Sequence, residues 1–259
     1  GRPDLACGPE VPADTMAGLL YDSLHGQLMT LPDAVEVYPA HGAGSLCGRN
    51  ISKETSSTIG EQRRANWALQ PMARDAFVRA LTADLPEAPA YFSYDAAMNR
   101  RGAPPLDSRP RTLSPAEADQ AIRDGAITLD VRPATAFGTG HLPGSVNVGL
   151  DGQFASWAGA LLPTDRPLVI VAEDEAGAAQ DGTRLARVGL EQVAGFLDGG
   201  FRAWADSGRP VARTAQVTVD ELERRLAAEP ALRVLDVRRP GEFASGHVPG
   251  AISLPLDRL

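Results

Sequence analysis

The sequence is poor in cysteine and contains no long apolar segment. Its 259 residues include two cysteines, Cys7 and Cys47, which are too few for a disulfide framework and fit a reducing compartment. No run of about 18 apolar residues is present, which excludes a membrane-spanning helix. The N-terminal GRPDLACGPEVP also has no apolar core of the signal-peptide type. We therefore expect a cytoplasmic protein without a membrane partner.

Excess positive charge is absent as well. The formal net charge is −8, so the chain offers no basic surface for nucleic acid. Its hydrophobic content of 43% is ordinary for a globular protein. The chain also starts without methionine and opens directly on a motif-like turn, and we expect it to be a fragment of a longer protein.

The most informative feature is an internal repeat. Residues 129–150 read LDVRPATAFGTGHLPGSVNVGL, and residues 235–256 read LDVRRPGEFASGHVPGAISLPL. The two segments are offset by 106 residues and share ten of 22 positions. A repeat of this length predicts several domains rather than one.

The sequence from Ser114 onward alternates between helix and strand patterns. The Ser-Pro pair at Ser114 predicts the start of a helix. Apolar segments at Ile127–Val131 and Leu168–Val171 predict two strands. The second segment is rich in β-branched residues, which predicts a central position in the sheet. Strands that alternate with helices indicate an α/β domain with a parallel sheet and right-handed crossovers. The same order restarts at Thr218.

The first hundred residues show a different pattern of predicted elements. Leucines near helical spacing predict a helix over residues 15–30, and Thr58 with Glu61 forms a capping-box pattern that opens another helix. Six prolines between Pro86 and Pro115 indicate a linker without regular structure. The predicted domains are residues 1–98, 113–214 and 215–259, with a linker at 99–112.

The repeated motif LDVR-x4-F-x2-GH-x-PG, followed in the first copy by a Gly-Gly-x-x-x-Trp segment, resembles the rhodanese family. This resemblance implies a buried Asp–Arg pair that ties a strand end to the following loop, and a turn that proline and glycine preset. We interpret these residues as architecture rather than catalysis. They are Asp130, Arg132 and His141 in the first copy and Asp236, Arg238 and His247 in the second.

An active rhodanese carries one cysteine after its central strand, in a loop whose N–H groups stabilise a thiolate or persulfide. The resemblance places Ala172 at that position. The loop AEDEAGAAQ has no thiol, and its three carboxylates at Glu173, Asp174 and Glu175 would repel a sulfur anion. We predict that the first copy does not transfer sulfur. The matching loop of the second copy is expected beyond Leu259, so whether that copy has an active cysteine stays open.

Three segments near the N-terminus resemble, in this order, the C-terminal part of a metallo-β-lactamase-fold domain. They are GRPD (residues 1–4), LYDSLHGQL (residues 20–28) and LPDAVEVYPAHG (residues 31–42). The subgroup that they resemble best is the glutathione-dependent persulfide dioxygenases. The predicted fold class is therefore α/β: part of a metallo-β-lactamase αββα fold, a rhodanese-like domain, and a partial second rhodanese-like domain.

This second resemblance implies roles for individual residues. Asp4 would be a metal ligand, and His41 would be the last histidine of the fold, which lies near a single Fe(II) or binds the second metal of two-metal hydrolases. The remaining histidine ligands would precede Asp4, so we expect this chain not to hold iron tightly. Arg49, in a glycine-rich loop after His41, is a candidate for contact with a glutathione carboxylate.

The two resemblances together imply an enzyme of sulfur metabolism. The parent protein would oxidise glutathione persulfide, or the persulfide of another small thiol, to sulfite with Fe(II) and O2, and an appended rhodanese would transfer sulfur. One alternative is a thioester hydrolase of the glyoxalase II kind, with zinc or mixed metals and His41 as a ligand. Another is a non-catalytic scaffold that only binds partners. The fold group also allows a homodimer.

Overall fold

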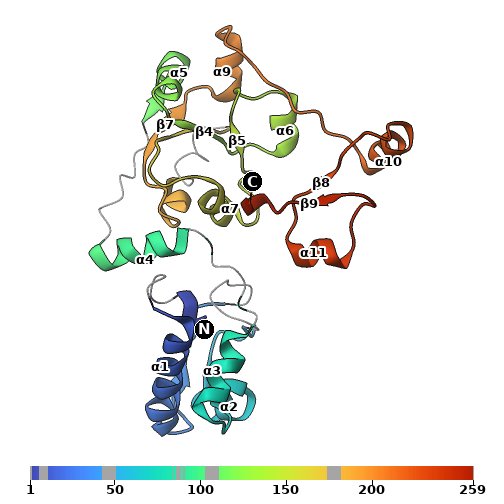
Figure 1. The fold of residues 1–259 in the computed structure, drawn as a ribbon. Coiled ribbons are helices and arrows are strands. Elements are labelled where there is room, and N and C mark those ends of the chain that lie inside the picture. The colour runs from blue at the N-terminus through green and yellow to red at the C-terminus, as the bar shows by residue number, and fades with distance from the viewer. Residues whose placement is uncertain are drawn as a thin grey trace. The chain divides into compact units, whose positions relative to one another are not determined.

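The computed structural model describes residues 2–5, 11–42, 51–83, 85, 89, 91–102, 111–173 and 182–258. The chain divides into two compact units, Gly1–Pro104 and Pro105–Leu259, and Figure 1 shows the elements of each. Within the described ranges, no helix is both long enough and apolar enough to cross a membrane.

The N-terminal unit is mainly helical. Its core gathers Ala17 from one helix and Phe77 and Leu81 from another, and the hydroxyl of Tyr21 donates to the carbonyl of Met72 at 2.8 Å. The elements are η1 (Pro3–Leu5), α1 (Ala13–Gly26), η2 (Leu28–Thr30), β1 (Glu36–Val37), β2 (Ser57–Thr58), α2 (Ile59–Ala65), η3 (Trp67–Leu69), α3 (Arg74–Thr82) and α4 (Tyr91–Arg101).

Two helices that the sequence predicts in this unit are present, and one expectation about its C-terminal part is wrong. The capping box at Thr58 and Glu61 is present and opens α2, and the helix expected over residues 15–30 forms α1 and the short η2. The expectation of no regular structure between Pro86 and Pro115 is wrong for residues 91–101, which form α4, and for Thr112 and Leu113, which form the short strand β3. Residues 91–101 contain no proline, so nothing interrupts a helix between the flanking prolines.

The first copy of the repeat, which runs from β3 to α9, is built on a five-stranded sheet. Its strand order is β3-β7-β6-β4-β5, and every pair of neighbours is parallel. The elements are β3 (Thr112–Leu113), α5 (Pro115–Arg123), β4 (Ile127–Asp130), α6 (Ala134–Thr139), β5 (Val146–Asn147), α7 (Phe154–Leu161), β6 (Leu168–Val171), a helical segment at 182–186, β7 (Val193–Leu197) and α9 (Gly200–Asp206).

The central position predicted for β6 is confirmed, and the strand is buried on both faces. Val169 and Val171 belong to a core cluster that includes Ala118 of α5 and Trp204 of α9, and Figure 1 shows these two helices on one side of the sheet with α7 on the other. Side chains alternate along a strand, so Leu168 and Ile170 face the opposite side, where they are also buried. The end of β6 is thus held firmly in place.

The second copy, which runs from α10 to η4, begins with the same order of elements. The elements are α10 (Val219–Ala228), β8 (Leu235–Asp236), α11 (Pro240–Ser245), β9 (Ile252–Ser253) and η4 (Leu256–Arg258). In the described residues β8 pairs only with β9, so Leu235 is 51% exposed whereas its counterpart Leu129 is 0% exposed.

Candidate functional site

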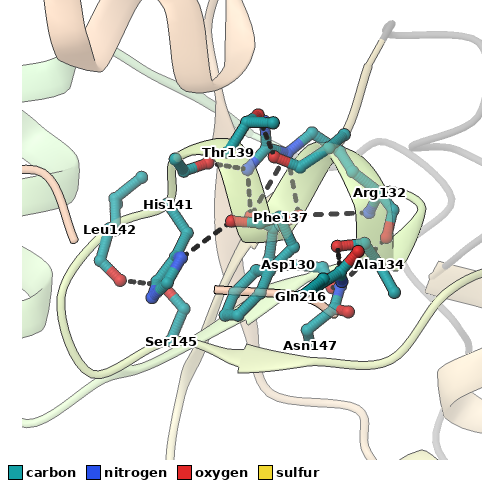
Figure 2. A network of polar contacts seen from close by, with 12 residues as sticks. Asp130, Arg132, Ala134, Phe137, Thr139, His141, Leu142, Ser145, Asn147 and Gln216 are labelled. Carbon is teal, nitrogen blue, oxygen red and sulfur yellow. Dashed lines mark hydrogen bonds and ion pairs between the residues drawn. The ribbon is translucent and has the colours of Figure 1, made fainter. Parts of the chain in front are cut away.

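The end of β4 carries an ion pair in the first copy. Asp130 is fully buried, and its carboxylate accepts hydrogen bonds from Nε of Arg132 at 2.9 Å and from Nη2 at 2.6 Å. The backbone N–H of Arg132 donates to the same carboxylate at 3.1 Å. Figure 2 shows this pair at the centre of a network of polar contacts. The geometry is the two-pronged contact that a guanidinium makes best with a carboxylate.

Arg132 also fastens the loop that follows α6. Its Nη2 donates to the carbonyl of Gly140 at 2.8 Å, and its guanidinium lies 4.5 Å from the ring centre of Phe201. A Cβ at Gly140 would come within 2.6 Å of that ring, which explains the glycine. The arginine therefore links strand, loop and helix α9, and all of its observed contacts hold the fold together.

His141 occupies a structural position in this loop. Its Nδ1 lies 2.9 Å from the carbonyl of Phe137, and the two rings stack with centroids 3.7 Å apart and an angle of 10° between their planes. The side chain is buried. The ring is thus held by a partner on the preceding turn, which is typical of a packed histidine rather than of an acid–base catalyst.

The second copy repeats the network in an exposed setting. Nε of Arg238 donates to Asp236 at 2.9 Å, and its Nη2 donates to the carbonyl of Gly246 at 2.8 Å. His247 stacks on Phe243 with centroids 3.8 Å apart. The hydrogen bond from Arg238 lowers the pKa of Asp236, and the same bond raises the pKa of Arg238. The contacts therefore follow from the local motif and do not require burial.

Ala172 lies directly after β6, as the sequence predicts for the position of a rhodanese cysteine. It is half-buried, and its carbonyl oxygen is so close to Gly200 that a Cβ there would approach it to 2.7 Å. Helix α9 therefore begins against the strand end. The chain has cysteines only at Cys7 and Cys47, so residues 111–259 contain no thiol. Asp174 and Glu175 lie outside the described residues, and Glu173 is exposed.

The structure describes two of the three candidate site residues of the N-terminal unit, Asp4 and His41. Both carboxylate oxygens of Asp4 accept hydrogen bonds from Arg2, one of them from Nε at 3.1 Å, and His41 is exposed in a bend after β1. No group of three histidine, cysteine or acidic side chains that could hold a metal occurs in the part of the chain that the structure describes. Asp4 and His41 alone do not fit an iron site. Arg49 lies outside the described residues.

The profile of the rhodanese-like domain matches residues 114–207 and 218–259, which together make up just over half of the chain. The chain belongs to the rhodanese-like family. Both matched ranges contain the Asp–Arg–His network, and the first contains Ala172.

Similar proteins are named as sulfurtransferases. The thiosulfate sulfurtransferase GlpE of Pseudomonas savastanoi pv. phaseolicola (strain 1448A / Race 6) is 35% identical over 91 residues, which are 35% of this rhodanese-like chain and 83% of that protein. The enzyme of the same name from Pseudomonas syringae pv. syringae (strain B728a) is 34% identical over 91 residues, which again are 35% of this chain and 83% of that protein.

A solved structure extends the likeness beyond the rhodanese copies. The crystal structure of a metallo-beta-lactamase from Staphylococcus aureus subsp. aureus COL is 27% identical, with a TM-score of 0.63, and covers 76% of this chain. This chain spans only 55% of the length of that structure. The predicted fold class is confirmed: a portion of metallo-β-lactamase type precedes the rhodanese-like α/β domain and the second rhodanese-like match.

Two contributors to the rhodanese network are not predicted by the sequence reasoning. Phe201 covers Arg132, and the side-chain amide of Asn147 donates to the carbonyls of Asp130 and Arg132 at 2.8 and 2.9 Å. The only sequence signal for Phe201 is its place directly after the Gly-Gly pair. Asn147 has Ser253 as its counterpart, so the repeat does not single it out.

Proposed function

We propose that this chain is part of an enzyme of sulfur metabolism in which a metallo-β-lactamase-type unit oxidises a small-thiol persulfide to sulfite. Glutathione persulfide is the proposed substrate, and O2 and Fe(II) are the proposed oxidant and metal. Three sequence segments, GRPD, LYDSLHGQL and LPDAVEVYPAHG, support the dioxygenase assignment. The likeness to named thiosulfate sulfurtransferases supports a role in sulfur chemistry.

Within that enzyme, the first rhodanese copy is a binding or spacer module rather than a catalyst. The observation that carries this assignment is the alanine at the end of β6. Sulfur transfer by a rhodanese requires a cysteine thiolate that becomes a persulfide, and the side chain of Ala172 contains no sulfur. The adjoining carboxylates of the sequence would also disfavour the binding of an anion at this position.

The fused arrangement has a physical advantage. A persulfide is short-lived, and a tethered neighbour meets it at a high effective concentration. The metal would need ligands in addition to Asp4 and His41, because two protein ligands leave a divalent ion weakly held. Arg49 is proposed to contact a carboxylate of the glutathione moiety, since a guanidinium binds carboxylates in a two-pronged geometry.

The experiment is oxygen uptake by the protein in its natural length after anaerobic loading with Fe(II). We expect O2 consumption and sulfite formation with glutathione persulfide, and no hydrolysis of S-lactoylglutathione. Hydrolysis of the thioester without O2 uptake would favour the glyoxalase II-like alternative. Replacing Arg49 by alanine should raise KM for the persulfide more than it lowers kcat, and an unchanged KM would remove Arg49 from the site.

A further inference from the structure

The segment between the two rhodanese matches lies along the edge of the first copy. We name residues 212–216 the strap. Ala212 and His141 exchange both backbone hydrogen bonds, at 2.9 and 3.0 Å, in an antiparallel bridge. The N–H of Thr214 donates to the carbonyl of Gly138 at 3.1 Å. The segment therefore adds a short edge strand to the loop that contains the GHxPG motif.

Side chains of the strap make two more contacts with the same loop. Nε of Arg213 donates to the carbonyl of Thr139 at 3.1 Å, and the amide of Gln216 donates to the carbonyl of Ala134 at 2.7 Å. Figure 2 shows Gln216 among the residues of the Asp130–Arg132 network. The strap thus follows α6 along its length, from His141, the second residue after the helix, to Ala134, its first residue.

The two copies differ in sequence where the strap docks. Gly138 of the first copy has Ala244 as its counterpart in the second. A Cβ at Gly138 would lie 3.0 Å from the carbonyl oxygen of Thr214 and 3.1 Å from the side-chain amide of Gln216. The backbone φ angle of Gly138 is not positive, so its conformation does not require glycine. The close approach of the strap is therefore the physical reason for a glycine at this position.

We propose that the connection between the two rhodanese copies is a docked strap, which leaves Val217 as the single residue between the last strap contact and the second copy. Thr218 follows immediately and caps α10, because its hydroxyl accepts a hydrogen bond from the N–H of Glu221 at 3.2 Å. The last backbone hydrogen bond of the strap is made by Thr214, and Gln216 is held through its side chain, so motion of the second copy against the first is restricted to the few residues between Thr214 and Thr218.

This arrangement differs from a flexible tether in its consequences. A free linker of the same ten residues (208–217) would let the second copy explore a volume set by random-coil statistics. A docked strap holds the first residue of the second copy at a fixed place on the first copy. A molecule bound to the first copy then meets the second copy at a set effective concentration. The proposal concerns the chain's own architecture and does not depend on the proposed enzymatic activity.

Amide hydrogen exchange on the whole chain tests the docking. The amides of Ala212 and Thr214 donate to the loop, whereas those of Arg213 and Ala215 donate no hydrogen bond to another described residue. We expect an alternating pattern, with slow exchange at Ala212 and Thr214 and fast exchange at the two residues beside them. Exchange at unstructured-peptide rates at all four positions would overturn the proposal.

A matched pair of variants tests the role of the glycine. Gly138→Ala brings in the residue of the second copy and favours helix α6 by its higher propensity, so the module should keep its fold while the strap loosens. We expect protection at Thr214 to fall by a factor of about 5 to 30, the factor that corresponds to one or two lost net hydrogen bonds. The reciprocal Ala244→Gly should leave Thr214 unchanged. Equal protection in both variants would contradict the proposal.

Limited trypsin digestion gives a second measurement with a different readout. The bond after Arg213 is solvent-exposed, but cleavage requires the chain around it to leave the loop. We expect slow cleavage after Arg213 in the parent chain and faster cleavage in Gly138→Val and Gln216→Ala, by a factor of about 5 to 30. Cleavage after Arg213 that is equally fast in all three proteins would show that the linker is not docked.

Discussion

Replacing Arg132 by alanine gives the sharpest test of the strand-end network. Among the described residues, the substitution removes every side-chain donor to the fully buried carboxylate of Asp130, and it also removes the donor to the carbonyl of Gly140. A buried carboxylate that loses its ion-pair partner typically costs about 3–5 kcal/mol of stability. We therefore expect the free energy of unfolding of the first rhodanese copy to fall by about that amount.

The second copy supplies the matched control. Arg238→Ala removes the same set of hydrogen bonds. The side chains of Arg238 and Asp236 are 46% and 10% exposed, against 8% and 0% for Arg132 and Asp130, so loss of the Arg238 guanidinium opens the Asp236 carboxylate to water. The effect on the second copy should therefore be much smaller.

Native-state hydrogen exchange measures both effects separately, through the amides of β4 and β6 for the first copy and those of Ile252 and Leu254 for the second. These two amides donate to carbonyls on and beside β8. A decrease of less than about 1 kcal/mol for Arg132→Ala, or equal decreases for the two variants, would refute the reasoning from burial.

Three further outcomes are expected. Leu129→Ala should cost about 2–5 kcal/mol by unfolding in urea, since Leu129 is fully buried, whereas Leu235→Ala should cost far less; equal losses would contradict this. Hydrogen bonds from the N–H and hydroxyl of Ser114 and from Arg111 lower the pKa of Glu117 from 4.5 to about 2, so Glu117 stabilises the fold above pH 4.5 and loses that effect as the pH falls towards 2. Glu117→Gln should therefore destabilise the chain at pH 7, with a difference that shrinks over this range and that thermal melts at several pH values would detect. Anaerobic loading of residues 1–259 should give far less than one iron per chain by metal analysis, and stoichiometric iron would show that its ligands are misassigned.

Much of the rhodanese portion could be predicted because its signals are local. The Asp–Arg pair spans two positions of one motif, and the same contacts form in both copies whether buried or exposed. The run LVIV predicts a central strand because the strands of a parallel sheet that is covered on both faces are typically continuous apolar runs.

The features that the sequence did not reveal depend on long-range contacts between exposed or polar groups. The strap is held by backbone and polar side-chain bonds, which leave no apolar pattern to read. Phe201 reaches Arg132 from a distant helix. The contact between Arg2 and Asp4 is the exception, since it is local to the motif GRPD, and the proposed role of Asp4 as a metal ligand stays a prediction.

An assay of thiosulfate:cyanide sulfurtransferase activity on residues 1–259 tests whether the first rhodanese copy can transfer sulfur. Because alanine follows β6 and no cysteine follows Cys47, we expect no cyanide-dependent thiocyanate above the rate without protein. A thiosulfate sulfurtransferase serves as the positive control. Sustained turnover, above all turnover that persists when Cys7 and Cys47 are both replaced by serine, would contradict this expectation.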